Sequence, residues 1–191
     1  MKIDEPYLII SLNDNKIIFL IVSFNEKNNF KLIKNFNIDS QGIQNGRVAD
    51  INIVSRIIKK KLNSIEEELN YFFSKASVII NPINVNCVNI SGYKKLNGSQ
   101  VSKSDIAYIL NNIKKTVTSN EDKYSLVHLF NYSFSLDSDN LENLPIGLFG
   151  EFYNQNMTFF LVNKNTLKNV KLVFNNCGIN VDRIILKPFV E

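Results

Sequence analysis

The chain has 191 residues, of which 45% are hydrophobic and 21% are charged, with a formal net charge of +4. This balance is typical of a soluble globular protein, with one large domain or two small ones, and excludes a disordered chain. The basic residues are scattered or lie near acidic ones, so the sequence does not indicate a nucleic-acid-binding patch.

The N-terminal residues lack the features of an export signal. Asp4, Glu5 and Pro6 interrupt the basic-then-apolar order of a signal peptide, and no apolar run approaches the roughly 18 to 20 residues of a membrane span. Cys87 and Cys177 have no partners at metal-ligand spacing, so two free thiols are expected rather than a disulfide. We therefore expect a cytoplasmic protein that does not cross a membrane by itself.

The first part of the chain predicts a hairpin, a third strand and a helix. Apolar runs and alternating polarity predict strands over residues 8–12, 17–22 and 30–38. The first two are joined by the tight polar turn Asn13-Asp14-Asn15. A loop with two glycines (SQGIQNGRVAD, 40–50) follows, and Asp50 is a good N-cap for a helix over 51–70.

The helix predicted over 51–70 has one apolar face. Its apolar residues recur at helical spacing, so that face is expected to be buried. Three lysines (59–61) lie close to three glutamates (66–68). We interpret this side as a solvated, charge-balanced surface rather than a ligand site.

The middle of the chain predicts a small module of strands and one helix. A buried strand over 76–81 ends at Pro82. We then expect, in order, a strand (85–91), a turn at Gly92, a short strand (93–96) and a turn at Asn97-Gly98. Ser102 and Asp105 form a box-like N-terminus for a helix over 102–116. A strand (124–136), a loop (137–150) and a strand (151–162) complete the module.

The last part predicts a helix over 165–176, ended by Cys177-Gly178, and a strand over 181–188. Because Glu191 follows this buried strand almost directly, we expect an incomplete sheet. The pattern predicts an α/β domain interrupted by a strand–helix–strand insert between Pro82 and Phe160.

Three stretches resemble the FtsA family of bacterial cell-division proteins, which are actin-like. SQGIQNGRVADINIVSRIIK (40–59) is similar to the family's Ser-x-Gly-(Ile/Met)-x-x-Gly-x-Val-x-Asp loop and helix, and QVSKSDIAYILNNI (100–113) to the start of its insert helix. SLVHLFNYSFSLDSDNLENLPIGLFG (125–150) resembles the segment VLHVIPQEYSLD…IKNPVGLFG. The segment 159–188 is similar to the family's following strand, helix, CGL-x-VD turn and strand.

The resemblance implies a partial actin-like (RNase H-like) fold. Residues 1–82 and 161–191 resemble subdomain 1A, which is cut short here, and residues 83–160 resemble the inserted strand–helix–strand–strand subdomain 1C. The family's second phosphate loop, adenosine pocket, FtsZ-binding subdomain and membrane-binding amphipathic helix would all lie beyond this chain. We therefore expect a fragment or a naturally short form, which reaches FtsZ and the membrane only indirectly.

The resemblance also implies a degenerate phosphate loop at Asn13, Asp14, Asn15 and Lys16. Family members have a longer connection here, with an acidic residue, Gly and Thr/Ser, whose amides and hydroxyls approach phosphate. Lys16 resembles the family's lysine, whereas Asp14 would repel phosphate unless Mg²⁺ bridged it. We expect no cofactor, with binding of ATP and Mg²⁺ as the alternative if residues beyond Glu191 complete the site.

No residue pattern indicates catalysis. His128 is the one histidine and has no cysteine or carboxylate at a useful spacing, so a structural hydrogen bond is expected, as for the family's histidine here. Ser40 and Ser91 lack a base partner, and neither phosphate-binding glycine motif is present. The acidic residues Asp4, Glu5, Asp14, Asp39 and Asp50 form no readable pair. The chain is expected not to be an enzyme and to hold no metal.

Protein–protein contacts are the function expected from the family's subdomain 1C. The exposed candidates are Tyr93, Lys94, Lys95, Lys103, Asn111, Lys114 and Lys115. The expected function is a divisome scaffold at the cytoplasmic face of the inner membrane, at the septum, with other division proteins and FtsA-type protomers as partners. The alternatives are an actin-like ATPase, a PilM-like type IV pilus adaptor, and an unrelated α/β binding module without a separate unit near residues 82–160.

Overall fold

The computed structural model describes residues 5–24 and 30–190, which divide into two compact units. One unit holds the residues up to Ile83 together with those from Asn165 onward, and the other holds Asn84–Lys164. The sequence predicts divisions after residues 82 and 160. The predictions above also include Asp4 and the two ends of the chain. These residues lie outside the part that the structure describes.

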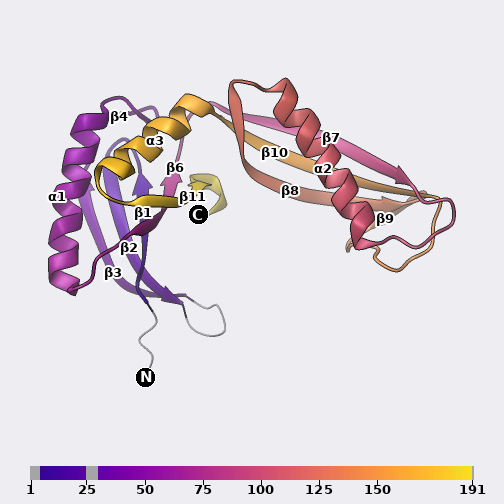
Figure 1. Cartoon of the computed structure of the whole chain (residues 1–191), viewed down its shortest axis with the longest axis horizontal. Helices are drawn as coiled ribbons and strands as arrows, with labels where there is room; N and C mark the ends of the chain where they lie inside the picture. Colours follow the sequence, from indigo (N-terminus) through magenta and orange to yellow (C-terminus); the bar gives the residue numbers. More distant parts are fainter. Residues whose placement is uncertain (1–4, 25–29, 191) are drawn as a thin grey trace. The chain divides into compact units, whose positions relative to one another are not determined.

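A five-stranded mixed sheet forms the centre of the first unit (Figure 1). Its strands lie in the order β11 (Asn180–Leu186), β6 (Lys75–Ile80), β1 (Tyr7–Leu12), β2 (Lys16–Phe24) and β3 (Phe30–Asp39). The first three are parallel, whereas β1, β2 and β3 form antiparallel pairs. The carboxyl ends of β1 and β6 therefore lie at the same end of the sheet, beside the β1–β2 turn.

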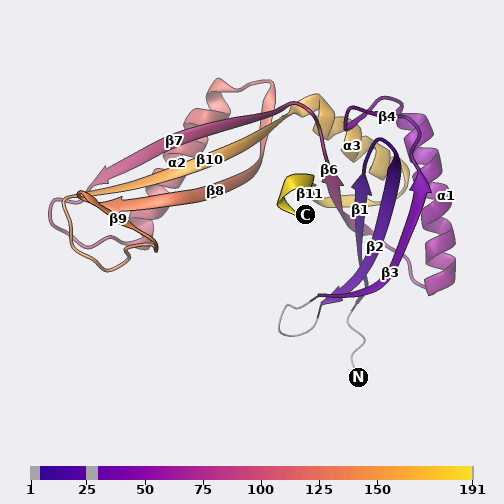
Figure 2. The same cartoon turned by 180° about the vertical axis from the view of Figure 1, so that it is seen from behind.

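Two helices, α1 (Ile51–Leu69) and α3 (Lys164–Asn176), cover one face of this sheet. Seen from behind, the strands lie in front of α3 (Figure 2). Asp50 caps α1 as predicted, because its carboxylate accepts a hydrogen bond from the Ile53 amide at 2.9 Å. The buried core of this unit includes Ile10, Phe19, Ile58, Val78 and Phe174. Hydrophobic burial therefore stabilises the packing of helices on sheet.

Part of the predicted glycine loop forms a small hairpin. β4 (Ile43–Gln44) pairs with β5 (Arg47–Val48) around a turn at Asn45 and Gly46. The two turn residues have φ values of 53° and 66°, as the tight turns favoured by Asn-Gly require. The prediction of a plain loop is therefore wrong for these residues.

The charged side of α1 contacts the neighbouring strand β3. Glu68 forms an ion pair with Lys34, and the Lys61 ammonium lies 4.5 Å from the centroid of the Phe36 ring. Both members of the ion pair are at least two-fifths exposed. The side is solvated, as predicted, but these partners come from β3 rather than from within the helix.

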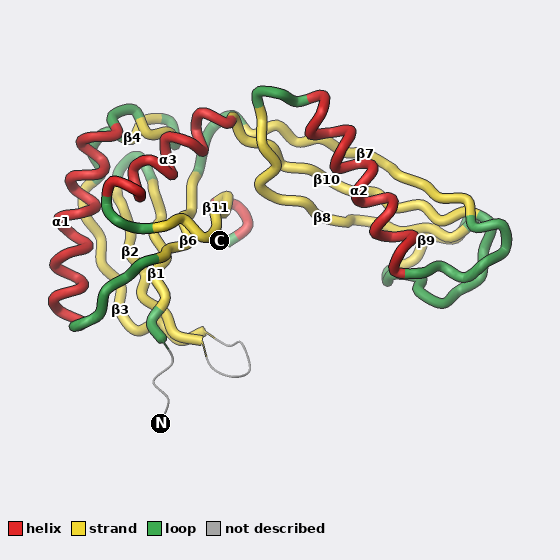
Figure 3. Tube along the Cα trace, in the orientation of Figure 1, coloured by secondary structure: helices red, strands yellow, loops and turns green. Residues whose placement is uncertain are grey.

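The second unit is a four-stranded antiparallel sheet with one helix along one face (Figure 3). Its strands lie in the order β7 (Val85–Lys95), β10 (Phe152–Asn163), β8 (Tyr124–Leu136) and β9 (Asp139–Leu141). The short strand β9 lies within the segment predicted as a loop. The unit extends to Lys164 because β10 pairs with both neighbours almost to its last residue.

The helix of this unit, α2 (Lys103–Asn120), begins at the predicted capping box. The Asp105 amide donates to the Ser102 hydroxyl at 3.3 Å, and the Ser102 amide donates to the Asp105 carboxylate at 2.8 Å. Helix and sheet side chains then form one core, which includes Ile109, Ile113, Val117, Tyr153, Met157 and Phe159. The local cap and the buried stripe together fix this helix on its sheet.

Gly92 lies inside one continuous strand, so the turn predicted at this residue is wrong. β7 pairs with β10 along its whole length. A Cβ atom at Gly92 would lie 2.4 Å from Ile109 Cγ2 and from Ile113 Cδ1. Glycine is needed here because α2 packs closely on the strand, not because the chain turns.

The C-terminal elements follow the prediction with one change. Gly178, with φ of 80°, follows α3 closely and ends it as expected. β11 ends at Leu186, and Lys187–Phe189 form a short 3-10 helix, η1. The predicted strand is shorter because Pro188 has no amide hydrogen for the sheet.

Candidate functional site

The four residues of the predicted phosphate loop form the turn between β1 and β2. Asn13 Nδ2 donates to the Ser11 hydroxyl at 3.2 Å and to the Lys16 carbonyl at 3.3 Å. The Asn13 amide donates to the same carbonyl at 3.2 Å, and the Asn15 carbonyl accepts from the Ser40 amide at 3.0 Å. The Lys16 side chain is exposed at the start of β2. The turn is thus held largely by bonds within the protein.

Asp14, at the tip of this turn, binds the β4–β5 hairpin. Its Oδ2 atom accepts a hydrogen bond from the Asn45 amide at 2.9 Å, and its Oδ1 atom accepts one from the Gly46 amide at 2.8 Å. Hydrogen bonds to an ionised carboxylate are stronger than those between neutral groups. The side chain that was expected to repel phosphate or to meet Mg²⁺ is therefore engaged by the protein's own backbone.

The Asn45-Gly46 turn also lies tightly against the end of β6. A Cβ atom at Gly46 would lie 1.8 Å from the carbonyl oxygen of Asn81, so there is no room for a side chain. The Ile83 amide donates to the Asn45 carbonyl at 3.5 Å. Three segments therefore meet at the carboxyl ends of β1 and β6, the end at which open α/β sheets bind their ligands.

The convergent amides of this junction already have an acceptor. Asp14 occupies the two amides that converge at the turn.

Across residues 5–24 and 30–190, no cluster of three or more His, Cys, Asp or Glu side chains could hold a metal ion. In the same residues, no helix is long and apolar enough to cross a membrane.

An open depression of about 350 Å³ lies between the end of β3 and α1. Its lining residues are Ile38, Asp39, Gln41, Ile57, Lys60, Lys61 and Ser64. Two lysines and one aspartate surround a partly apolar floor, so charges of both signs meet there. The depression favours neither an anion nor a cation.

His128 lies on β8 among aromatic side chains. Its ring stacks on Phe130 with centroids 6.0 Å apart, and Phe130 packs edge-on against Phe160 at 5.8 Å. Burial lowers the pKa of His128 and so favours the neutral ring. The structural hydrogen bond expected for this histidine stays a prediction.

Both cysteines are free thiols. Burial raises the pKa of Cys177 to about 11, whereas Cys87 is exposed.

The seven predicted interaction residues do not form one patch. Tyr93 and Lys95 project from β7 onto the sheet face opposite α2, where Lys95 lies 6.0 Å from the Phe152 ring centroid. Lys94 projects to the helix side, where it forms an ion pair with Asp105 at 2.5 Å. Because side chains alternate along a strand, Lys94 belongs to the contact between sheet and helix rather than to an open surface.

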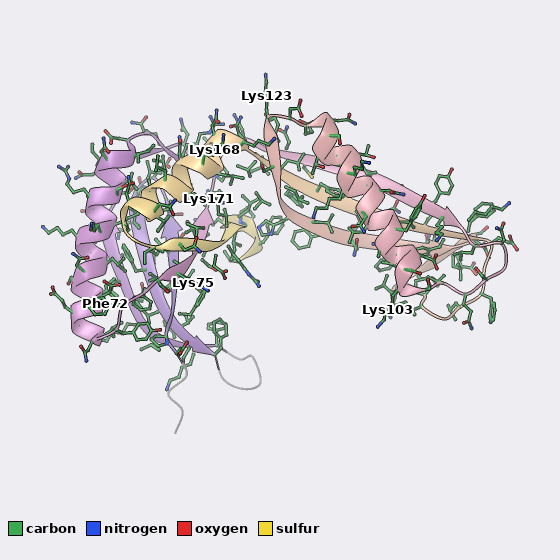
Figure 4. All side chains as sticks on the ribbon, in the orientation of Figure 1. Phe72, Lys75, Lys103, Lys123, Lys168 and Lys171 are labelled. Atoms are coloured by element: carbon green, nitrogen blue, oxygen red, sulfur yellow. The ribbon has the colours of Figure 1, made fainter. Side chains whose placement is uncertain are left out.

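The other four candidates lie on the exposed side of α2. Lys103, Asn111, Lys114 and Lys115 are all exposed, and Lys103 lies at the N-terminal end of the helix (Figure 4). The one acidic residue of α2, Asp105, is buried and paired with Lys94. The exposed side of this helix is therefore basic.

A second aspartate binds two consecutive amides, this time in the second unit. Asp137 Oδ1 accepts hydrogen bonds from the Glu151 and Phe152 amides, both at 2.8 Å. The Asp137 amide in turn donates to the Phe152 carbonyl at 2.7 Å. These bonds close the loop between β8 and β10.

Sequence reasoning missed the residues that hold these turns. The Asn45-Gly46 pair between two short apolar stretches is a strong hairpin signal and could have been recognised. No local pattern indicates that Asp14, 31 residues before Asn45, is its partner. The contact depends on how two separate hairpins pack.

Comparison with known proteins first defines the class. No family model matches the chain. Among solved structures, the PilM-PilN type IV pilus biogenesis complex matches with a TM-score of 0.64 at 13% identity, over 97% of this chain and 48% of that chain. Such a likeness concerns the fold alone. The chain has a partial actin-like fold, which confirms the predicted fold class.

Curated sequence relatives then show which particular protein the chain resembles. Seven match, and all carry the name cell division protein FtsA. The protein of Buchnera aphidicola subsp. Schizaphis graminum is 23% identical over 176 residues, which cover 92% of this chain and 42% of the relative. That of subsp. Baizongia pistaciae is 26% identical over 143 residues, which cover 75% and 34%. The chain is thus similar to FtsA proteins over most of its length, and it spans well under half of these relatives' length.

Proposed function

We propose that this chain acts in cell division as a non-enzymatic scaffold that carries protein–protein contacts. The observation that carries the proposal is the similarity to seven proteins named for cell division, which extends over 75–100% of the chain. The engagement of Asp14 by backbone amides supports a scaffold role, because it leaves the loop region poorly suited to a nucleotide phosphate.

The exposed side of α2 is the surface proposed for these contacts. Lys103, Lys114 and Lys115 give it a positive charge without an exposed acidic residue on the same helix. A partner with an acidic segment would be steered to such a surface. We propose as partners the cytoplasmic parts of other division proteins and FtsA-type protomers. FtsZ and the membrane would be reached only through regions outside this chain.

The proposed place of action is the cytoplasmic face of the inner membrane at the septum. The test is fluorescence microscopy of the whole chain, fused to a fluorescent protein and expressed in its own host. The expected result is a band at the division site. A triple variant, Lys103→Glu, Lys114→Glu and Lys115→Glu, should become diffuse at the same protein level, while a variant with Tyr93→Ser on the opposite face should keep the band.

A band that persists in the triple variant would exclude the α2 side as the contact surface. Diffuse fluorescence of the unaltered chain would contradict the division role. Two other functions predict other results. A pilus adaptor would localise with the pilus machinery, and the fold likeness to the PilM-PilN complex gives this only weak support. An actin-like ATPase would bind Mg-ATP once residues beyond Glu191 were present.

A further inference from the structure

We propose that the Asp14 carboxylate is an internal anion, which occupies the amide pair of Asn45 and Gly46 and closes that pair to phosphate from solution. The inference deepens the nucleotide part of the proposed function and is independent of the division role. Asp14 thereby gains a role that the neighbouring sequence does not indicate. Its carboxylate takes the place of a bound anion and does not coordinate Mg²⁺.

The geometry of the amide pair is the first argument. The two amides are consecutive, lie in a turn with positive φ at both residues, and each meets a different oxygen of one carboxylate. Backbone amides that converge in this way form an anion-binding concavity in many phosphate sites. A carboxylate and a phosphate present similar oxygen acceptors to such donors.

The rigidity of the pair is the second argument. Gly46 lies so close to the Asn81 carbonyl that a Cβ atom would be 1.8 Å from it. The Ile83 amide also donates to the Asn45 carbonyl, so the turn contacts the segment after β6 independently of Asp14. Donors that are fixed before binding lose little conformational freedom when an anion arrives. Removal of the carboxylate should leave these amides in place with no acceptor.

The third argument is competition. Asp14 is held close to the amides by the β1–β2 turn, so it binds them at a high effective concentration. A phosphate from solution must displace this tethered group and approach its negative charge. Both effects disappear when the carboxylate is removed. Open α/β sheets bind ligands at the carboxyl ends of their strands. The two amides lie at this end of β1 and β6, where a phosphate from solution could reach them.

The experiment is a titration of the whole chain with inorganic pyrophosphate, followed through the amide signals of Asn45 and Gly46 by NMR. Asp14→Ala should bind pyrophosphate at least about tenfold more tightly than the unaltered chain, with the largest shifts at these two amides. Asp14→Asn keeps the shape and one acceptor oxygen, so its gain should be smaller. Asp137→Ala removes the same kind of contact in the other unit and should show no gain.

Three results would overturn the proposal. The first is equal pyrophosphate affinity in the unaltered chain, Asp14→Ala and Asp14→Asn. The second is a gain in Asp14→Ala whose shifts lie away from Asn45 and Gly46. The third is an equal gain in Asp137→Ala. Asp14→Asn serves as the test variant if alanine lowers stability too far. None of these results bears on septal localisation, so failure here and failure of the division role are distinguishable.

Discussion

Two aspartates, one in each unit, each bind two consecutive backbone amides, Asp14 through both carboxylate oxygens and Asp137 through one. Asp137 closes a loop between neighbouring strands, and a backbone bond from its own amide to Phe152 supports the same closure. Asp14 joins two separate hairpins, because the amides that it binds lie 31 and 32 residues further along the chain. The contact lies at the carboxyl ends of β1 and β6. The same chemistry completes a loop in one unit and closes a potential binding position in the other.

The surroundings of the two contacts differ as well. Gly46, bound by Asp14, faces the backbone of Asn81, which cannot move without disturbing β6. Gly150, next to the amides bound by Asp137, faces the side chain of Leu136 rather than its backbone. We therefore expect the junction in the first unit to tolerate change less well than the loop in the second.

Gly46→Ala should give the largest effect. The new Cβ atom would clash with the Asn81 carbonyl in a backbone conformation that already disfavours side chains, so the free energy of unfolding should fall by about 3 kcal/mol or more. Gly178→Ala is the matched control, because its φ is also positive but nothing lies within 4 Å of the new atom. It should cost about 1 kcal/mol. Urea unfolding measures both, and equal losses would refute the tight junction.

Gly150→Ala should have a smaller effect on the second unit. A Cβ atom here would lie 2.5 Å from Leu136 Cδ1, and adjustment of this side chain should limit the loss to about 1 to 2 kcal/mol. The measurement is again urea unfolding, with a probe placed in this unit. A loss as large as that of Gly46→Ala would remove the proposed difference between the two regions.

The smallest effect concerns the pH dependence of the second unit. The hydrogen bond from Lys94, and then that from Ser102, lowers the pKa of Asp105 from 3.8 to about 2. A lowered pKa means that the stabilisation is present above about pH 4 and is lost as the pH falls towards 2. Because Lys94 is about one-third exposed, we expect a loss of only about 1 kcal/mol.

Thermal unfolding between pH 5 and pH 2 tests this expectation. Asp105→Asn should be less stable than the unaltered chain at pH 5, and the difference should shrink at pH 2. Glu68→Gln is the control, because the Lys34–Glu68 pair is exposed on both sides and should contribute less than about 0.5 kcal/mol. A constant difference between Asp105→Asn and the unaltered chain across this pH range would show that the ion pair is not the cause.

Local signals predicted the elements that local bonds define. The caps at Asp50 and Ser102 and the apolar stripe of α1 depend on residues a few positions apart, and the structure confirms them. The prediction of a turn at Gly92 is wrong because a glycine fits a turn as well as a strand, and only the packing of α2 decides between them. The distance in sequence between Asp14 and its amides likewise hides a contact that depends on tertiary structure.

The family resemblance supplied what local patterns could not. The order of weak motifs along the chain led to the actin-like fold, although no single motif was specific. It does not show how the interaction candidates are distributed, because a turn predicted at Gly92 interrupts the alternation along β7. With β7 continuous, Lys94 falls on the helix side and Tyr93 and Lys95 on the other.

The central claim is that the protein closes its own phosphate position, and calorimetric titration of the unaltered chain with Mg-ATP tests it most directly. We predict no saturable binding at nucleotide concentrations up to about 1 mM, which corresponds to a binding free energy weaker than about 4 kcal/mol. Micromolar binding of Mg-ATP that is lost on Asp14→Asn would contradict the account, because Asp14 would then serve the nucleotide rather than exclude it.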